Sequence, residues 1–384
     1  MKTFEEINEK IRKGEAVIVT AEEVIELVEE KGIKDTAKYV DVVTTATFGP
    51  MCSSGAFLNF GHSDPPMRME KISLNNVNTY AGIAAVDAYI GATEVSTDRD
   101  IEYGGAHVIC DLIDGKEICL EATAKGTDCY PRKSISTTIT KDSINEAYLF
   151  NPRNCYQNYA AAINTSDRTL HTYMGTLEPH MGNINYSTSG ELSPLLNDPY
   201  LRTIGIGTRI FLGGAAGYVS WHGTQFITEK PRGENGIPLS PAATLALIGD
   251  LKEMSTEFIQ PAVFEGYGTS IFVGVGIPIP VLDEELLENL AVKNRDILTN
   301  IVDYSVPRRD KPILGKCSYE QLRSGLIELE GRKIETAPLS SLYKARLIAR
   351  TLGDWIKEGK FFLQEPIEAF PKVLSLNNIN QYNE

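Results

Sequence analysis

Short runs of β-branched and other apolar residues, separated by glycines, fill the chain from residue 44 to about residue 280. Such runs are typical of β-strands, because branched side chains fit a pleated surface and glycine permits the turns between strands. Residues 134–139 and 271–275 are two examples, and prolines at 278 and 280 follow the second. The pattern predicts a mixed sheet with Gly-rich strand–loop segments.

Helical patterns precede this region. Thr3 with Glu6, and Thr20 with Glu23, have the capping-box spacing, in which side chains satisfy the free amides of a first helical turn. The apolar run at residues 16–19 lies between these two signals and suits a short buried strand. The N-terminal segment is therefore predicted to read helix, strand, helix.

After Pro307 the composition shifts towards Lys, Arg, Glu and Leu, and apolar residues recur at helical spacing over residues 342–356. We therefore predict an α/β protein with a mixed sheet, Gly-rich strand–loop segments and a helical C-terminal portion. The expected division is a catalytic α/β body at residues 1–310 and a helical portion at residues 311–384 packed on it.

Two local patterns give further expectations. Residues 108–112 and 118–122 are apolar and are joined by Asp114 and Gly115, a pair that tolerates the backbone of a tight turn, so they predict a hairpin. Residues 242–257 follow a Ser-Pro pair that suits a helix start, so they predict a helix.

Acidic residues outnumber basic ones by 51 to 37, which gives a formal net charge of −14. Phosphate-rich surfaces would repel most of such a molecule, so we expect no nucleic-acid binding and no attachment to anionic membranes. The charged N-terminus does not resemble a signal peptide, and no apolar stretch reaches the roughly 18 residues of a membrane helix. We expect a cytoplasmic protein.

The chain has six cysteines and no Cys-x-x-Cys motif. In a cytoplasmic protein these cysteines should be reduced thiols, and any metal site would have to assemble from distant segments. Cys52 is the first catalytic candidate. It lies in a turn-rich segment, residues 44–55, whose free backbone amides could stabilise a thiolate.

Cys129 is the second catalytic candidate, again just after a predicted strand. Arg132 and Lys133 follow it closely, and either cation would favour the thiolate, whereas Asp128 would oppose it. Arg132 and Lys133 are also candidates for binding a negatively charged substrate. A buried structural cysteine and a solvated basic turn are the plainer readings of these features.

Cys155 could join Cys52 and Cys129 as the third ligand of an iron–sulfur cluster, so these three are candidate cluster ligands, and no metal is otherwise assigned. The remaining cysteines, Cys110, Cys119 and Cys317, are better explained as structural residues.

His62 is the best candidate for general acid–base catalysis, because imidazole exchanges protons near neutral pH and His62 is close to Cys52 in sequence. Arg68 and Arg153 are candidates for gripping a substrate carboxylate with a planar two-pronged donor. Isolated arginines can equally form ordinary ion pairs.

The Gly-rich segment at residues 204–217 suggests a nucleotide-binding loop, and hence a nicotinamide-dependent oxidoreductase. It lacks a correctly spaced Gly-x-Gly-x-x-Gly and any Gly-Lys-Ser/Thr, so close packing of a strand against backbone is the better interpretation.

Five segments together resemble the homocysteine-biosynthesis family, the L-aspartate semialdehyde sulfurtransferases of methanogenic archaea and anaerobic bacteria. The resemblance runs over essentially the whole chain and is carried by residues 49–55 (GPMCSSG), 65–70 (PPMRME), 103–107 (YGGAH), 126–132 (GTDCYPR) and 221–224 (WHGT). The two functional cysteines of the family correspond to Cys52 and Cys129. Archaeal members often continue into a pair of CBS domains, which we do not expect in this chain.

The resemblance implies an enzyme of sulfur assimilation, in homocysteine and methionine biosynthesis, that forms L-homocysteine from L-aspartate semialdehyde and reduced sulfur. An aldehyde and sulfide are together two electrons short of a thiol, so an external donor is required, and a separate ferredoxin-like protein is the implied partner. In the hypothetical mechanism Cys52 carries a persulfide and Cys129 resolves a Cys52–Cys129 disulfide, which requires both sulfurs to converge in one pocket.

Two further expectations accompany this mechanism. We expect a homo-oligomer. A non-catalytic sulfur carrier or iron–sulfur scaffold remains the alternative function.

Overall fold

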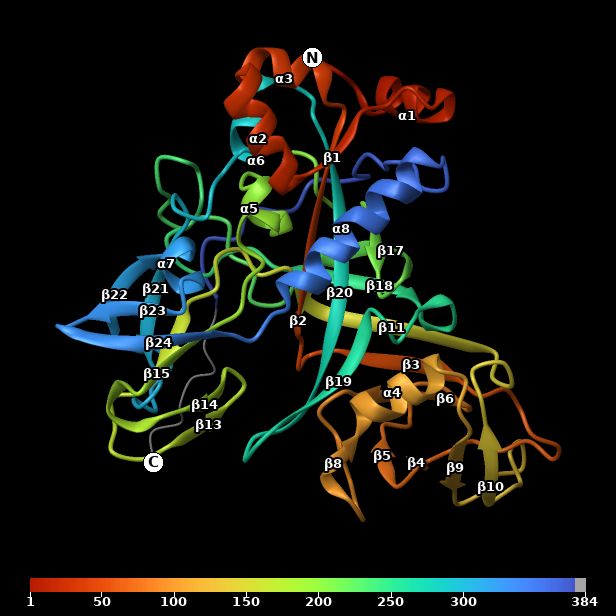
Figure 1. Ribbon diagram of the computed structural model, residues 1–384. Coiled ribbons are helices and arrows are strands. Elements are labelled where there is room, and N and C mark those ends of the chain that lie inside the picture. The colour runs from red at the N-terminus through yellow and green to blue at the C-terminus, as the bar shows by residue number, and fades with distance from the viewer. Residues whose placement is uncertain (377–384) are drawn as a thin grey trace.

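The structure, a computed structural model, describes residues 1–376 and has a mixed α/β architecture, as predicted. Two six-stranded sheets and a small hairpin surround a ten-stranded central sheet. In Figure 1 the long strand β20 crosses the middle of the molecule beside β2, with one smaller sheet on each side.

The central sheet is antiparallel except for its first pair, β1 and β2. Its strands, in spatial order, are β1 (Ile18–Thr20), β2 (Val42–Pro50), β20 (Gly268–Pro280), β16 (Arg209–Leu212), β17 (Ala215–His222), β18 (Leu245–Asp250), β11 (Glu146–Asn154), β3 (Gly55–Asn59) and β6 (Asp87–Gly91), and β19 (Ile259–Phe264) also pairs with β20.

The two smaller sheets come from different parts of the chain. The first consists of β10 (Ser134–Ile139), β9 (Ile118–Thr123), β4 (Lys71–Leu74), β5 (Val77–Thr79), β7 (Val95–Ser96) and β8 (Asp100–Gly104). The second consists of β22 (Ile313–Ser318), β21 (Leu298–Asp303), β12 (Ala161–Ile163), β15 (Asn183–Tyr186), β24 (Arg332–Pro338) and β23 (Leu326–Leu329). The separate hairpin is β13 (Leu170–Thr172) with β14 (Gly175–Leu177).

Eight α-helices connect or cover these sheets in the described part of the chain. They are α1 (Phe4–Lys13), α2 (Ala21–Lys31), α3 (Ile33–Tyr39), α4 (Gly105–Ile113), α5 (Pro194–Asn197), α6 (Glu284–Leu290), α7 (Tyr319–Arg323) and α8 (Leu342–Lys357). The two predicted capping boxes are confirmed: Thr3 caps α1 with Glu6, and Thr20 caps α2 with Glu23.

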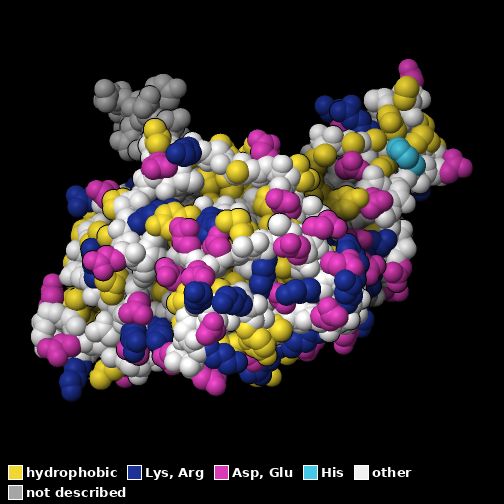
Figure 2. Space-filling model, turned by 90° about the horizontal axis from the view of Figure 1, so that it is seen from above, with side chains coloured by type: hydrophobic (Ala, Val, Ile, Leu, Met, Phe, Trp, Pro, Cys, Tyr) yellow, Lys and Arg dark blue, Asp and Glu magenta, His cyan; other side chains and the backbone are white. Residues whose placement is uncertain are grey.

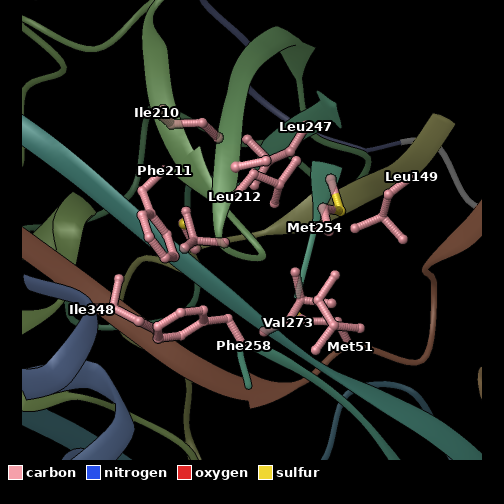
Figure 3. Close-up of a cluster of buried hydrophobic side chains, with 14 of the residues drawn as sticks. Met51, Leu149, Ile210, Phe211, Leu212, Leu247, Met254, Phe258, Val273 and Ile348 are labelled. Carbon is pink, nitrogen blue, oxygen red and sulfur yellow. The ribbon is translucent and has the colours of Figure 1, made fainter. Parts of the chain in front are cut away.

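The main core lies between α8 and the central sheet. The buried side of α8 includes Ile348 and Leu352, which pack over Gly274 and Gly276 of β20. Figure 3 shows Ile348, Phe258 and Phe211 beside β20, and the rings of Phe211, from β16, and Phe258 meet edge to face with 5.1 Å between centroids. Burial of each such side chain stabilises the fold by about 1.5–3 kcal/mol.

The Gly-rich segment at residues 204–217 forms the hairpin of β16 and β17. Gly213 and Gly214 occupy its turn with φ values of +61° and +96°, which glycine adopts without steric cost. A side chain at Gly217 would collide with Leu212. These glycines therefore serve turn geometry and close packing, as the sequence pattern indicated.

Two local predictions are wrong. Residues 105–113 form α4 and not the first strand of a hairpin, because this apolar segment is buried on almost every side and a helix satisfies its backbone internally. Residues 245–250 form β18 and not part of a helix, because the segment is buried in the central sheet between β17 and β11. Burial against the rest of the fold therefore determined the secondary structure of both segments.

The C-terminal portion contains helix α8 but also supplies three strands. β22 pairs with β21 and β24 pairs with β15, both from within residues 1–310, and β23 pairs with β24, so the second small sheet is built from both parts of the expected division. The boundary at residue 310 stays a prediction.

Charges of both signs are interspersed over the face of the molecule in Figure 2. Among the described residues, no helix has the length and apolar composition needed to cross a membrane.

Candidate active site

A cavity of about 350 Å³ lies where the end of β2, the segment after β11 and two hairpin turns meet. The turn between β13 and β14 contributes Tyr173, and the turn between β19 and β20 contributes Tyr267. These two rings meet edge to face at 6.2 Å between centroids. The cavity also contains Cys52, Arg153 and Cys155, which makes it the candidate active site.

Cys52 is presented to the cavity by the turn between β2 and β3. The Met51 amide donates to the Ile271 carbonyl at 2.7 Å, and the Ser54 amide closes the turn on the Met51 carbonyl at 3.0 Å. The Met51 side chain is buried beside Val273 in the core (Figure 3). A rigid sheet therefore holds the backbone on which Cys52 sits.

Two hydroxyl groups face the Cys52 sulfur. Ser270 Oγ donates a hydrogen bond to Cys52 Sγ at 3.3 Å. Burial, and then the charge and hydrogen bonding of Cys52, raise the pKa of the Tyr267 phenol. Tyr267 therefore stays protonated near neutral pH and can donate to an anionic sulfur.

Tyr156 is a third hydroxyl near the same sulfur. Burial raises the pKa of Tyr156 to about 12, while the Arg153 cation lowers it and Cys52 raises it slightly. These interactions indicate that Cys52, Arg153 and Tyr156 lie close together.

Arg153 is a cation without a carboxylate in its cavity. The pairing of β11 with β18 has an irregularity between Asn151 and Asn154, a bulge of the kind that redirects side chains near functional sites. The Arg153 Nε atom is buried and has no hydrogen-bond partner among the described residues. No Asp or Glu is among the residues that line the cavity. The site can therefore accept an anion, and a carboxylate matches the planar guanidinium best.

Cys155 is fully buried at the cavity wall and has the left-handed backbone φ of +52°. Few residues other than glycine adopt this conformation, and such residues concentrate at functional sites. Burial raises the pKa of the Cys155 thiol, so Cys155 is a neutral thiol in this state.

Cys129 lies outside the cavity, on the exposed loop between β9 and β10. The next residue, Tyr130, stacks on His62 with 6.3 Å between ring centroids, and the Arg132 amide donates to the Pro66 carbonyl at 3.3 Å. Cys129 and His62 therefore belong to one exposed cluster.

Strand β3 separates this cluster from the cavity. Cys52 comes three residues before β3 begins at Gly55, and His62 comes three residues after it ends at Asn59. A five-residue strand is about 14 Å long from its first to its last Cα. The structure therefore does not bring Cys52 and Cys129 together in one pocket of a single chain.

The other predicted site residues divide in the same way. Arg153 and Cys155 line the cavity with Cys52, whereas none of the other candidates does: Arg68, His62, Arg132 and Lys133. Arg68, His62 and Lys133 are exposed, and Arg132 lies on a face of the first small sheet beside Lys71.

The three candidate cluster ligands, Cys52, Cys129 and Cys155, do not fit a three-thiolate cluster, because Cys129 lies outside the cavity that holds the other two. Within residues 1–376, no group of three or more His, Cys, Asp or Glu residues is arranged to hold a metal ion.

Reasoning from sequence missed the hydroxyl groups of the cavity. Tyr267 stands between two glycines, Gly266 and Gly268, both with positive φ, and Tyr156 directly follows Cys155. A tyrosine held in a Gly-Tyr-Gly turn was the available signal, since such a turn can present a large side chain to a site.

Comparison with known proteins identifies the family. Residues 16–363 match the family described as "Homocysteine biosynthesis enzyme, sulfur-incorporation". The chain belongs to this family of sulfur-incorporating enzymes, which confirms the resemblance seen in the sequence.

Two relatives share more than half of their aligned residues with this chain. It is 52% identical over 380 residues to the L-aspartate semialdehyde sulfurtransferase of Methanosarcina acetivorans, covering 99% of this chain and 74% of that protein. It is 53% identical over 388 residues to the enzyme of the same name from Methanocaldococcus jannaschii, covering 97% of this chain and 74% of that protein. An uncharacterized protein of Methanothermobacter thermautotrophicus is 31% identical, covering 83% of this chain and 71% of that protein. No solved structure matches the chain.

Proposed function

We propose that this chain is an L-aspartate semialdehyde sulfurtransferase, which forms L-homocysteine from the semialdehyde and reduced sulfur. Its family and its similarity to two enzymes of that name support the reaction. The observation that carries the proposal is a single cavity with the Cys52 thiol and the Arg153 cation, whose Nε atom has no hydrogen-bond partner in the described structure.

Arg153 would bind the carboxylate of the semialdehyde. A two-pronged pairing of guanidinium and carboxylate fixes both the position and the orientation of a small substrate. The aldehyde carbon would then point towards Cys52, with the phenols of Tyr156 and Tyr267 near the carbonyl oxygen. Protonated phenols can donate to the oxyanion that forms when sulfur adds to the aldehyde.

Electron counting defines what must be supplied from outside. Addition of sulfide to the aldehyde and loss of water give a thioaldehyde, and two electrons and two protons convert the thioaldehyde to the thiol. If the sulfur arrives as a persulfide on Cys52, two more electrons are needed, because persulfide sulfur is more oxidised than sulfide. We propose a ferredoxin-like protein as the external low-potential donor and the cytoplasm as the compartment.

Cys129 stays in this proposal as a second catalytic thiol that exchanges with external reductant or sulfur. It could meet Cys52 if its loop came from another copy of the chain in a homo-oligomer, or if the loop moved. We expect Cys129→Ala to abolish homocysteine formation, and full activity in this variant would remove Cys129 from the mechanism.

The reaction itself is tested by anaerobic turnover. Purified protein is incubated with L-aspartate semialdehyde, sulfide and a low-potential reductant, and the product is identified by mass. Homocysteine formed in the presence of protein, and lost with Cys52→Ala, is the expected result. Absence of homocysteine, with sulfur retained on the protein, would favour the sulfur carrier.

Substitution of Arg153 tests the substrate-binding role. Loss of a charge-assisted pairing worth about 1.5–3 kcal/mol should lower kcat/KM for Arg153→Met by about 10- to 100-fold. Arg295→Met removes an exposed arginine that pairs with its neighbour Asp296 and does not line the cavity, and it should leave kcat/KM unchanged. Equal kcat/KM values for Arg153→Met and the wild type would exclude Arg153 from binding the substrate.

A further inference from the structure

We infer that Cys155 is the resolving thiol for Cys52: it attacks a persulfide on Cys52, forms a Cys52–Cys155 disulfide and releases sulfide inside the cavity. The inference rests on the proposed function, and it gives that function a step in which enclosed sulfide is produced next to the aldehyde.

The chain segments that carry the two cysteines run side by side. Strands β11 and β3 are antiparallel, and their pairing ends at Phe150 opposite Gly55. Beyond this pair the two segments stay side by side through a side-chain contact, in which Asn151 Nδ2 donates to Ser54 Oγ at 2.8 Å.

The next contact brings the two segments to the cavity. Ser53 Oγ donates to the Arg153 carbonyl at 3.4 Å. Three residues further on, Tyr156 interacts electrostatically with Cys52. Cys155 lies between these two points of contact, and both cysteines line the same cavity.

The backbone at Cys155 is held in an unusual conformation. Its φ of +52° is in the left-handed region, and its amide donates to the side-chain oxygen of Asn154 at 2.6 Å. A residue kept in this region costs about 1–3 kcal/mol and persists only where the surroundings enforce it. The side chain of Cys155 is buried at the edge of the main core and at the same time lines the cavity.

The other buried cysteines have ordinary structural surroundings. Cys110 donates a weak hydrogen bond to the Ile259 carbonyl, with 3.8 Å between sulfur and oxygen, inside the main core. Cys317 is packed in the core of the second small sheet. Neither lines the cavity, so in the described structure Cys52 and Cys155 are the cysteines that share it.

The step balances in atoms and electrons. The Cys155 sulfur attacks the Cys52 sulfur, the bond between Cys52 and the outer sulfur breaks, and the outer sulfur leaves with both electrons of that bond. The leaving sulfide takes up the Cys155 proton, so no unpaired charge is left on the buried thiol. A low-potential two-electron reductant, a dithiol or an electron-transfer protein, must then return the disulfide to two thiols.

The test isolates this half-reaction from the aldehyde. The full chain is reduced, desalted under anaerobic conditions and loaded with inorganic polysulfide as the probe. Sulfide release is followed after excess polysulfide is removed, and the linked cysteines are identified by peptide mass. Wild-type protein should release about one sulfide per chain and yield a Cys52–Cys155 disulfide.

Cysteine variants show which thiol releases sulfide from the persulfide on Cys52. Cys155→Ser should keep the persulfide on Cys52 and release sulfide at least about 10-fold more slowly. Cys119→Ser, at an exposed position outside the cavity, is the matched control and should release sulfide at the wild-type rate. Wild-type release from Cys155→Ser, or a disulfide that joins Cys52 to Cys129, would overturn the inference.

The wild-type peptide map decides the question even if Cys155→Ser does not fold. Because this half-reaction uses no semialdehyde, its failure leaves the turnover assay and the Arg153 variants unaffected. If the Cys52–Cys155 disulfide forms as expected but the protein does not convert the semialdehyde to homocysteine, the proposed substrate would be contradicted instead.

Discussion

At the scale of single residues, the reactivity of Cys52 should depend on Ser270. The Ser270 hydroxyl donates to the Cys52 sulfur at 3.3 Å, and a hydrogen bond of this kind stabilises the anion that reacts with electrophiles. A hydrogen bond worth about 1 kcal/mol corresponds to a rate change of about 5-fold. We therefore expect Ser270→Ala to slow alkylation of Cys52 by iodoacetamide at pH 7 by about that factor.

Peptide mass mapping gives the rate for each cysteine separately. Cys119 is exposed, about 150 residues from Ser270 in sequence and outside the cavity, so its rate in the same sample serves as the internal reference. A Cys52 rate that matches the wild type, with Cys119 unchanged, would show that the Ser270 hydroxyl does not act on the sulfur.

The sequence indicated several site residues but not their grouping. Cys52 and Arg153 stood out by residue type and local composition, and both line the cavity. Their proximity depends on the pairing of β11 with β3, which joins segments about 100 residues apart and has no local signal. The separation of Cys129 from Cys52 depends on the same pairing, because β3 places a strand's length between them. The chemistry of a side chain can be inferred from the local sequence. Which side chains meet in one cavity depends on the order of the strands in the sheet.

At the scale of elements, the packing of α8 on the central sheet gives a pair of opposite stability predictions. A side chain at Gly353 of α8 would meet its nearest atom, in Ile18, at 3.6 Å, so alanine fits there. Gly353→Ala should raise the free energy of unfolding by about 0.5–1 kcal/mol, because glycine loses more backbone entropy in a helix. Gly276 of β20 has Ile348 within 3.0 Å of an added Cβ, so Gly276→Val should lower it by about 1–3 kcal/mol through overpacking.

Urea denaturation under anaerobic conditions measures both effects. The two glycines lie on the two sides of one interface, so each variant is the control for the other. Shifts of the same sign in both variants would contradict the packing described for α8.

The elements that sequence predicted well are those with local signals. The capping boxes of α1 and α2 depend on residues three positions apart. Strand β10 was predicted from a short run of residues that favour strands, with turn residues just before it. The segments of α4 and β18 were assigned wrongly because both are apolar throughout, and periodicity cannot distinguish a buried helix from a buried strand. Their neighbours in space decide the conformation.

At the scale of the whole molecule, the chain is arranged around the long pair β2 and β20. Val42 of β2 lies opposite Pro280 of β20, which joins segments more than 200 residues apart. One end of this pair supports the N-terminal helices, and the other end carries Cys52 and the turn with Tyr267. The sequence pattern predicted many strands, but it contained no information about which distant strands would become neighbours.

Asp41, just before β2, links the N-terminal layer, which is the segment of residues 1–13 with α1, to the central pair of strands. This contact should make the free energy of unfolding depend on pH. Its side chain is 1% exposed and contacts Lys2 at 2.9 Å and Lys10 at 2.7 Å, and it accepts from the Val17 amide at 3.0 Å. Burial favours the neutral acid, but these hydrogen bonds and the lysine charges outweigh burial and lower the pKa of Asp41. A carboxyl whose pKa is lower in the folded state stabilises the fold above its unfolded pKa of about 3.9. That stabilisation is lost as pH falls through the lower, folded-state pKa.

Asp41→Asn should therefore lower the free energy of unfolding near pH 7 by about 1–3 kcal/mol, because buried charge-assisted hydrogen bonds are lost. The difference between wild type and variant should shrink as pH falls below about 4, because the unfolded state then binds a proton that the folded state, with its lowered Asp41 pKa, does not yet bind. Urea denaturation at a series of pH values measures this difference. Glu9→Gln, in an exposed pair on α1, is the control, and it should leave the free energy of unfolding nearly unchanged because solvent screens the pair. A wild-type advantage over Asp41→Asn that stays constant from pH 7 to pH 3 would mean that the Asp41 charge does not hold the N-terminal layer in place.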